Sequence, residues 1–141
     1  KAQEVNKEIA KYVDVMIKTP LSFKSNGIYL NWPDLHLLIR NLCKRWNAFS
    51  DDMKFDDQEI IEFLEKSIAL GFYKLSSTRF DMEGTYSPAA QGQFSIRLTG
   101  NDMAKRWIGL LLEFATYAGI GVKTAMGMGG IESKMHSGHS K

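Results

Sequence analysis

The amino-acid sequence predicts an α+β domain of the ferredoxin-like, or RRM-like, class, with the element order β-α-β-β-α-β. Segments with the two-residue period of strands and segments with helical spacing follow one another in that order, once the first two helices are counted as one crossover layer. In this class the helices cover one face of an antiparallel sheet, and the other face is free to bind something. The sequence also places a glycine-rich loop before the last strand.

The first strand is predicted over residues 12–18, where apolar side chains recur on one face: Val13, Val15 and Ile17. Residues 23–30 are expected to return as a short hairpin that turns at residues 25–27. This hairpin extends the strand before the first helix begins.

The first helix opens at residues 32–34, because Pro33 suits the first helical position and Asp34 is favourable to the helix dipole. Its buried stripe consists of apolar residues at helical spacing: Leu35, Leu38, Ile39, Leu42, Trp46 and Phe49. Three basic residues lie outside the stripe, and we interpret them as a solvated face: Arg40, Lys44 and Arg45.

A second helix is predicted over residues 57–70, with Asp56 as its N-cap and Gly71 as its C-terminal cap. Two strand segments follow, at residues 72–82 and 93–98. The residues between them, 83–92, have little core-forming content and are expected to form a loop at the tip of a long hairpin.

Asn101 is expected to cap the last helix, which carries one apolar face: Met103, Trp107, Leu110, Leu111, Phe114 and Ala118. From Glu132 onward the sequence is rich in Ser, Gly, His and Lys, which is typical of a frayed chain end. We therefore expect a domain over residues 12–134, a flexible tail over 135–141, and a linker over 1–11 that leads from a missing N-terminal domain.

The composition is that of one globular domain, because 44% of the 141 residues are apolar and 24% are charged. It excludes disorder, collagen and a disulfide-rich mini-protein, and its longest apolar run falls short of the ~20 residues of a membrane span. A net charge of +2 does not by itself indicate a nucleic-acid binder. The single cysteine, Cys43, excludes an internal disulfide and suits a reducing cytoplasm, where we expect the protein.

Five of the twelve glycines lie between residues 119 and 130, directly after the last helix. Glycine adopts positive φ at little cost and lets another backbone approach closely, and successive amides in such turns can bind an anion. With Lys123 and Thr124 at its centre, this stretch predicts a phosphate cradle. It fits neither the Walker nor the dinucleotide pattern, because its glycines close a helix instead of opening one. The alternative is that Gly119 is only a helix cap and the rest a tight route into an edge strand.

No catalytic, metal-binding or cofactor-binding residue is predicted. His36 lies beside apolar residues of a helix, which favours a packing or surface role, and His136 and His139 fall in the expected tail. A general acid or base must be held near the bond it acts on, which a mobile tail does not do. The two tail histidines have no further ligand nearby to complete a metal site. Cys43 is interpreted as a small packing residue.

The glycine pattern resembles a known signature. Residues 119–121 (Gly-Ile-Gly), five residues that include Lys123, and residues 127–129 (Gly-Met-Gly) resemble the C-terminal motif of the RAMP superfamily of CRISPR systems. Three other segments are similar, more narrowly, to its CRISPR RNA-processing endoribonucleases, of the kind that accompanies type III systems: residues 19–27, 45–47 and 98–100. The resemblance covers nearly the whole chain from Tyr12 onward.

This resemblance implies two tandem ferredoxin-like domains in the full-length protein, of which the chain matches the C-terminal one. Members of the family cut the repeat RNA of a CRISPR transcript into guide RNAs without a metal, by attack of a ribose 2′-hydroxyl. Their catalytic residues come mostly from the N-terminal domain, so we expect this chain alone to be inactive. The implied partners are repeat RNA or crRNA, the chain's own N-terminal domain, and a homodimer or an effector complex.

Together, the residues and the resemblance predict RNA contacts at the glycine-rich loop: Gly119, Gly121, Lys123, Thr124, Gly127, Gly129 and Gly130. Secondary candidates lie in the first hairpin and on the strands: Lys24, Ser25, Arg79 and Arg97. Two other readings stay open. One is a non-cleaving RAMP subunit that binds guide RNA in an effector complex, and the other is a small-ligand or protein-interaction module whose glycines only shape a turn.

Overall fold

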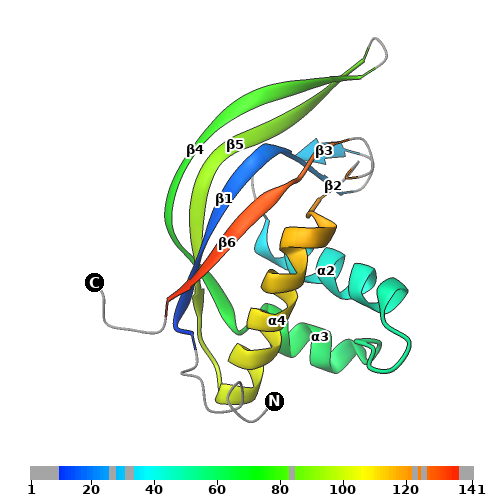
Figure 1. Cartoon of the computed structure of the whole chain (residues 1–141), viewed down its shortest axis with the longest axis vertical. Helices are drawn as coiled ribbons and strands as arrows, with labels where there is room; N and C mark the ends of the chain where they lie inside the picture. Colours follow the sequence, from blue (N-terminus) through cyan, green and yellow to red (C-terminus); the bar gives the residue numbers. More distant parts are fainter. Residues whose placement is uncertain are drawn as a thin grey trace.

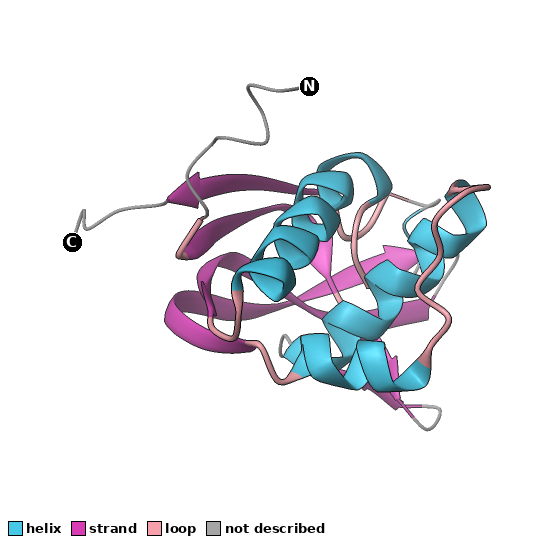
Figure 2. Cartoon of the chain, turned by 90° about the horizontal axis from the view of Figure 1, so that it is seen from below, coloured by secondary structure: helices cyan, strands magenta, loops and turns pink. Residues whose placement is uncertain are grey.

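In the part of the chain that the structure describes, a four-stranded antiparallel sheet carries three helices on one of its faces (Figures 1 and 2). The structure, a computed structural model, describes residues 10–25, 28–30, 34–82, 85–121, 124 and 127–136. The strands of this sheet are β1 (Tyr12–Leu21), β4 (Ile68–Met82), β5 (Thr85–Leu98) and β6 (Ile131–His136). The helices are α2 (Leu35–Phe49), α3 (Gln58–Glu65) and α4 (Asp102–Ala118), and β2 (Phe23–Ser25) pairs with β3 (Ile28–Leu30) in a separate hairpin.

The strand order in the sheet is β4-β5-β1-β6, so the first strand lies between the two that are furthest from it in sequence. Strand β1 pairs antiparallel with both neighbours, since Val15 faces Phe94 on β5 and Ser133 on β6. With α2 and α3 as one crossover layer, this is the predicted ferredoxin-like arrangement. The predicted fold class and the hairpin of residues 23–30 are both confirmed, although the turn residues 26 and 27 lie outside the described part.

The core lies between the sheet and the helices. Alternate residues of β1 point into it, as the sequence predicts, and Val13, Val15 and Ile17 are at most 8% exposed. They meet fully buried side chains of the two long helices: Leu38, Ile39, Leu42, Ile108, Leu111 and Leu112. Each such side chain contributes about 1.5–3 kcal/mol to folding when it is fully buried.

Side-chain caps begin all three helices. Asp34 accepts hydrogen bonds from the amides of His36 and Leu37, at 3.0 and 3.1 Å. Asn101 accepts one from the amide of Ala104 at 2.8 Å, as predicted. Helix α3 is capped by Asp57 and not by Asp56, because its chain turns helical one residue later than predicted.

Helix α3 is shorter than the sequence predicts. It ends at Glu65, and β4 begins at Ile68, which pairs with Leu98 on β5. Residues 68–70 therefore belong to a strand and Gly71 does not cap the helix. The apolar residues Ile68 and Leu70 fit both the helical and the strand spacing, and their pairing with β5 makes this segment a strand.

Residues 85–92 are also strand rather than loop, since β5 begins at Thr85 and pairs with β4, and residues 83 and 84 lie outside the described part. From Thr85 to Ala89, β5 does not pair with β1, so this part of β5 and the facing part of β4 project as a two-stranded arm past the rest of the sheet (Figure 1). Proline is tolerated where a strand lacks one neighbour, and Pro88 lies in this arm.

Residues 132–136, for which the composition predicts a frayed chain end, belong to β6, which pairs with β1 from Ile131 to His136. The strand thus runs two residues past the predicted border at residue 134. Residues 1–9 and 137–141, which hold most of the predicted linker and tail, lie outside the described part. Among the described helices, none is both long and apolar enough to cross a membrane.

Candidate functional site

The glycine-rich stretch, residues 119–130, lies at the end of the sheet where α4 stops and β6 begins (Figure 1). Helix α4 ends at Ala118 and is capped by Gly119, whose amide donates to the carbonyl of Ala115 at 2.8 Å and whose φ is +76°. A positive φ at this position favours glycine, as the capping alternative predicts. The capping alternative thus accounts for Gly119.

Two further glycines are required by the protein's own packing. A Cβ at Gly121 would clash with the carbonyl oxygen of Ser22, and one at Gly129 with the carbonyl oxygen of Ile120. Both glycines are buried and have positive φ, at +83° and +75°. Close approach of a backbone is indeed what these glycines permit, and the backbone that approaches is the chain's own.

Gly127 differs from the other four described glycines of this stretch. It is exposed, and a Cβ on it would meet nothing within 4 Å, although its φ is +97°. Gly130 is half-buried against Thr19. Among these five glycines, Gly127 is therefore the one whose surface is open to a ligand.

The amides of these glycines donate within the protein. Their acceptors are backbone carbonyls and side-chain oxygens: those of Ala115, Asn41, Thr124, Pro20 and Thr19, for Gly119, Gly121, Gly127, Gly129 and Gly130 in turn. They are thus not free donors for a phosphate. The predicted cradle then depends on Thr124, which is half-buried, and on Lys123, which lies outside the described residues.

Arg45 and Asn41 of α2 hold the glycine-rich stretch in place. Nη1 of Arg45 donates to the carbonyl of Ala118 and to Oγ1 of Thr124, both at 2.8 Å, and Nη2 donates to the carbonyl of Gly121 at 2.5 Å. One turn earlier, Oδ1 of Asn41 accepts from the amide of Gly121 at 3.1 Å. Burial lowers the pKa of Arg45. The interpretation of Arg45 as part of a solvated face is therefore wrong.

The other two basic residues of that predicted face are exposed, as expected. Arg40 forms an ion pair with Glu65, whose side chain is 5% exposed, and this hydrogen bond raises the pKa of Arg40. His36 lies 3.3 Å from the same carboxylate, which fits its predicted surface role. Lys44 is exposed on the next turn of α2.

Cys43 is 1% exposed, and burial raises the pKa of its thiol to about 11. The thiol therefore stays protonated near neutral pH, which agrees with the predicted packing role and not with a nucleophile.

The secondary candidates lie in three different places. Lys24 is exposed in β2, two residues after Ser22, and so lies near the glycine-rich stretch. Arg79 is on the projecting arm, opposite Pro88. Arg97 pairs with Tyr12 at the far end of the sheet from Ile131, where the stretch enters β6. The side chain of Ser25 lies outside the described part.

The open face of the sheet carries a second group of interacting side chains. The ring of His136 stacks on Tyr12, with centroids 4.6 Å apart and planes inclined by 11°, and its Nε2 lies 2.9 Å from Oδ2 of Asp14. His136 is thus fixed on β6, contrary to the expectation that it lies in a mobile tail. His139 lies outside the described residues.

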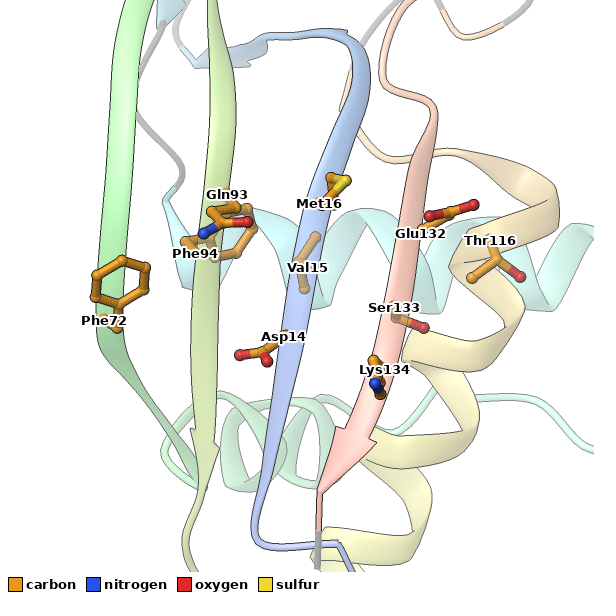
Figure 3. A pocket seen from close by; sticks show the side chains of 10 residues that line it. All are labelled: Asp14, Val15, Met16, Phe72, Gln93, Phe94, Thr116, Glu132, Ser133 and Lys134. Carbon is orange, nitrogen blue, oxygen red and sulfur yellow. The ribbon is translucent and has the colours of Figure 1, made fainter. Parts of the chain in front are cut away.

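A cavity of about 540 Å³ is lined by residues of all four strands of the sheet and by Thr116 of α4 (Figure 3). Met16 and Phe72 give it an apolar surface, since they are 45% and 59% exposed. Asp14, Glu132 and Lys134 add charges of both signs. The lining of this cavity therefore has no excess of positive charge, and its surface suits bases or apolar side chains better than phosphates.

Within the described part of the chain, no group of three or more histidine, cysteine or acidic side chains is arranged to hold a metal ion. Neither described histidine lies at the glycine-rich stretch, since His36 contacts Glu65 and His136 contacts Asp14. The described residues at the stretch thus offer the hydroxyl of Thr124 and a defined shape, but no group that titrates near neutral pH.

Comparison with known proteins gives one family. The model of the CRISPR-associated endoribonuclease Cas6 family matches residues 15–131. A Cas6 endoribonuclease of Streptococcus thermophilus is 27% identical over 127 residues, which cover 90% of this chain and 52% of that protein. One of Mycobacterium tuberculosis (strain CDC 1551 / Oshkosh) is 33% identical over 113 residues, which cover 80% of this chain and 36% of that protein.

A solved Cas6 product complex has the same fold, with a TM-score of 0.81 at 19% identity. The match covers 94% of this chain and 55% of that one. The chain thus spans about half the length of the relatives that it matches, or less.

Proposed function

The chain belongs to the CRISPR-associated endoribonuclease Cas6 family, and from this we propose that it is the RNA-binding C-terminal half of an enzyme that cuts CRISPR repeat RNA into guide RNAs. Its span of about half the matched relatives supports the assignment to one half. The glycine-rich stretch, which resembles the C-terminal RAMP signature, supports the choice of the C-terminal one. A type III-like enzyme is the form that the narrower sequence resemblance favours.

The observation that carries the proposal is the way the glycine-rich stretch is folded. Its described residues form hydrogen bonds with side chains of α2 and with the backbone of β1, and these bonds hold the stretch at one end of the sheet. We assign RNA phosphate contacts to Lys123 and to the hydroxyl of Thr124, with the exposed turn at Gly127 as the point of closest approach. Lys24 in the adjacent hairpin adds a second cation.

The buried glycines have a different role in this proposal. Gly119, Gly121 and Gly129 allow the stretch to fold tightly, and they act on RNA only through that shape. Arg79 and Arg97 are too far apart to join one phosphate site, so they are proposed as separate contacts along a longer RNA.

The cutting step is assigned to the full-length protein. In-line attack of a 2′-hydroxyl needs a base at that hydroxyl and an acid at the leaving oxygen, both held in position. The family resemblance implies that these groups lie in the N-terminal half and that the reaction needs no metal. We therefore propose that this half is the chain's first partner and that repeat RNA binds across both.

The test is fluorescence anisotropy of the 141-residue chain with RNA of the CRISPR repeat from its own locus, at rising salt. Weak binding that falls with salt is expected, because few phosphates are neutralised at a net charge of +2. No binding at low salt would contradict the proposal. A full-length protein that binds the RNA but leaves it intact would instead be a non-cleaving RAMP subunit.

A further inference from the structure

The glycine-rich stretch follows the C-terminus of α4, and this end of a helix is unfavourable for binding an anion. The C-terminus of a helix carries a partial negative charge, and anions prefer the N-terminus. The last carbonyls of α4 belong to this end, and those of Ala118 and Gly119 lie at the start of the stretch. A phosphate at Thr124 would be repelled by them unless a positive charge intervenes.

Arg45 supplies that charge at the required place. Its Nη1 donates to the carbonyl of Ala118 at 2.8 Å and lies 3.4 Å from the carbonyl of Gly119. We propose that Arg45, assisted by Asn41, is a positioning residue for RNA: it cancels the negative end of α4 and holds the glycine-rich stretch in its RNA-binding shape. This inference rests on the proposed function.

The guanidinium has the geometry for holding several chain segments together. It reaches the helix end at Ala118, the first turn of the stretch at Gly121 and the middle of the stretch at Thr124. A planar fork of fixed N–H donors can serve these three acceptors together, whereas a lysine ammonium is a compact charge without that fork. Arg45 is therefore not replaceable by lysine.

Asn41 holds the same point of the stretch from a second direction. Its side chain accepts from the amide of Gly121 at 3.1 Å and donates to the carbonyl of Gly121 at 3.5 Å. Both backbone groups of this glycine are thus bound by α2. Since Gly121 also packs directly on Ser22, its position is defined from both sides.

The contacts of Arg45 separate its role from that of a direct phosphate ligand. Both terminal nitrogens already donate to acceptors of the protein, and the side chain is half-buried. Thr124 is affected differently, because its hydroxyl accepts from Arg45 and its own hydrogen stays available to donate. Arg45 thus orients a donor for the phosphate without contacting it.

The experiment compares variants of the full 141-residue chain by fluorescence anisotropy with the labelled repeat RNA. Arg45→Lys keeps the charge and loses the fork, and it is expected to weaken binding on the order of tenfold. Arg45→Met is expected to weaken it further. Lys44→Met is the matched control, because it removes the same charge from the neighbouring exposed position of α2 and should change affinity less than about twofold.

A double-mutant cycle distinguishes positioning from a merely structural role. If Arg45 positions the stretch, Lys123→Ala weakens binding in the wild type but has little further effect in Arg45→Lys. If the two losses add, or if the salt slope falls by about one unit for Lys123→Ala and by a similar amount for Arg45→Met, Arg45 is an independent phosphate ligand and the proposal is overturned. If loss of affinity only follows loss of folded protein, it is also overturned.

Hydrogen exchange tests the holding of the stretch without RNA. Arg45→Lys and Asn41→Ser are expected to raise exchange at the amides of Gly121 and Gly129 and to leave Val15 in the sheet unchanged. Unchanged exchange at the stretch, or a uniform rise with a lower melting temperature, would overturn the proposal. If the wild type fails to bind RNA, the proposed function fails and the RNA role with it, and exchange alone then decides whether Arg45 holds the stretch.

Discussion

Gly121 packs directly against the carbonyl oxygen of Ser22, so that a Cβ on this glycine would overlap that oxygen. The contact joins the start of the glycine-rich stretch to the end of β1, and both residues are buried. The positive φ of Gly121 adds a second reason why no other residue fits. A glycine that looks suited to ligand binding is in this case a requirement of the fold.

We therefore expect Gly121→Ala to destabilise the protein by about 3 kcal/mol, combining the cost of a left-handed backbone with that of overpacking. Thermal and urea unfolding measure this change. Gly109→Ala is a suitable control, because Gly109 lies inside α4 with open space around it and alanine favours helix. If Gly121→Ala kept full stability, the close contact with Ser22 would be refuted.

Gly127→Val should have the opposite profile, with a larger effect on RNA binding than on folding. The position is exposed and has open space, so the cost to folding is only the strain of a positive φ, about 1–2 kcal/mol. A β-branched side chain on this turn would block approach of an RNA backbone. Melting temperature and RNA affinity are measured together, and a large drop in melting with intact affinity would favour the purely structural alternative.

Some elements follow from the sequence because a single local pattern determines them. Strand β1 alternates between Val13, Val15 and Ile17 on the core side and more exposed residues on the other, and one buried face is enough to produce that period. The caps at Asp34 and Asn101 are equally local, since each side chain binds an amide two or three residues away.

Other features depend on partners that are distant in the sequence. Residues 85–92 have few core-forming side chains and become strand because β4 pairs with them. Helix α3 ends earlier than predicted because Ile68 pairs with Leu98 on β5. In the sequence, Arg45 is only a basic residue outside an apolar stripe, and such a position predicts a solvated side chain. Its role becomes visible once the fold brings Ala118, Gly121 and Thr124 beside α2.

Lys123→Ala is expected to weaken binding to all RNA sequences about equally and to lower the salt slope by roughly one unit. The reason is that a flexible ammonium next to Thr124 meets phosphate rather than base edges. Anisotropy titrations with the repeat RNA and with a scrambled RNA of equal length, at several salt concentrations, measure both effects. A changed sequence preference with an unchanged slope would make Lys123 a base reader.

Cys43 should resist alkylation in the folded protein. Its thiol is buried and its pKa is raised to about 11, so on the order of one thiol in a thousand is ionised at pH 8. Iodoacetamide should label it only on unfolding, as mass spectrometry of native and urea-treated samples would show.

The same shift gives a pH dependence of stability. An acid whose pKa is raised by folding stabilises the native state below its unfolded pKa, and this contribution is lost as pH rises through the folded value. The free energy of unfolding should therefore fall between about pH 8.5 and pH 11 by more in the wild type than in Cys43→Ala. Equal pH profiles for the two proteins would contradict this assignment.

The chain alone should bind repeat RNA and fail to cut it, both in EDTA and in magnesium. Cleavage by 2′-hydroxyl attack needs a base and an acid rigidly placed at the scissile bond. Of the two described histidines, His36 contacts Glu65, and His136 is stacked on Tyr12 at the far end of β6 from the glycine-rich stretch. End-labelled repeat RNA, incubated with the purified chain in both buffers, gives the answer on a denaturing gel. A single cut with a cyclic-phosphate end in EDTA would place the catalytic groups within these 141 residues. The first residues to substitute would then be Lys123, Arg97 and Tyr117, an exposed phenol in the last turn of α4.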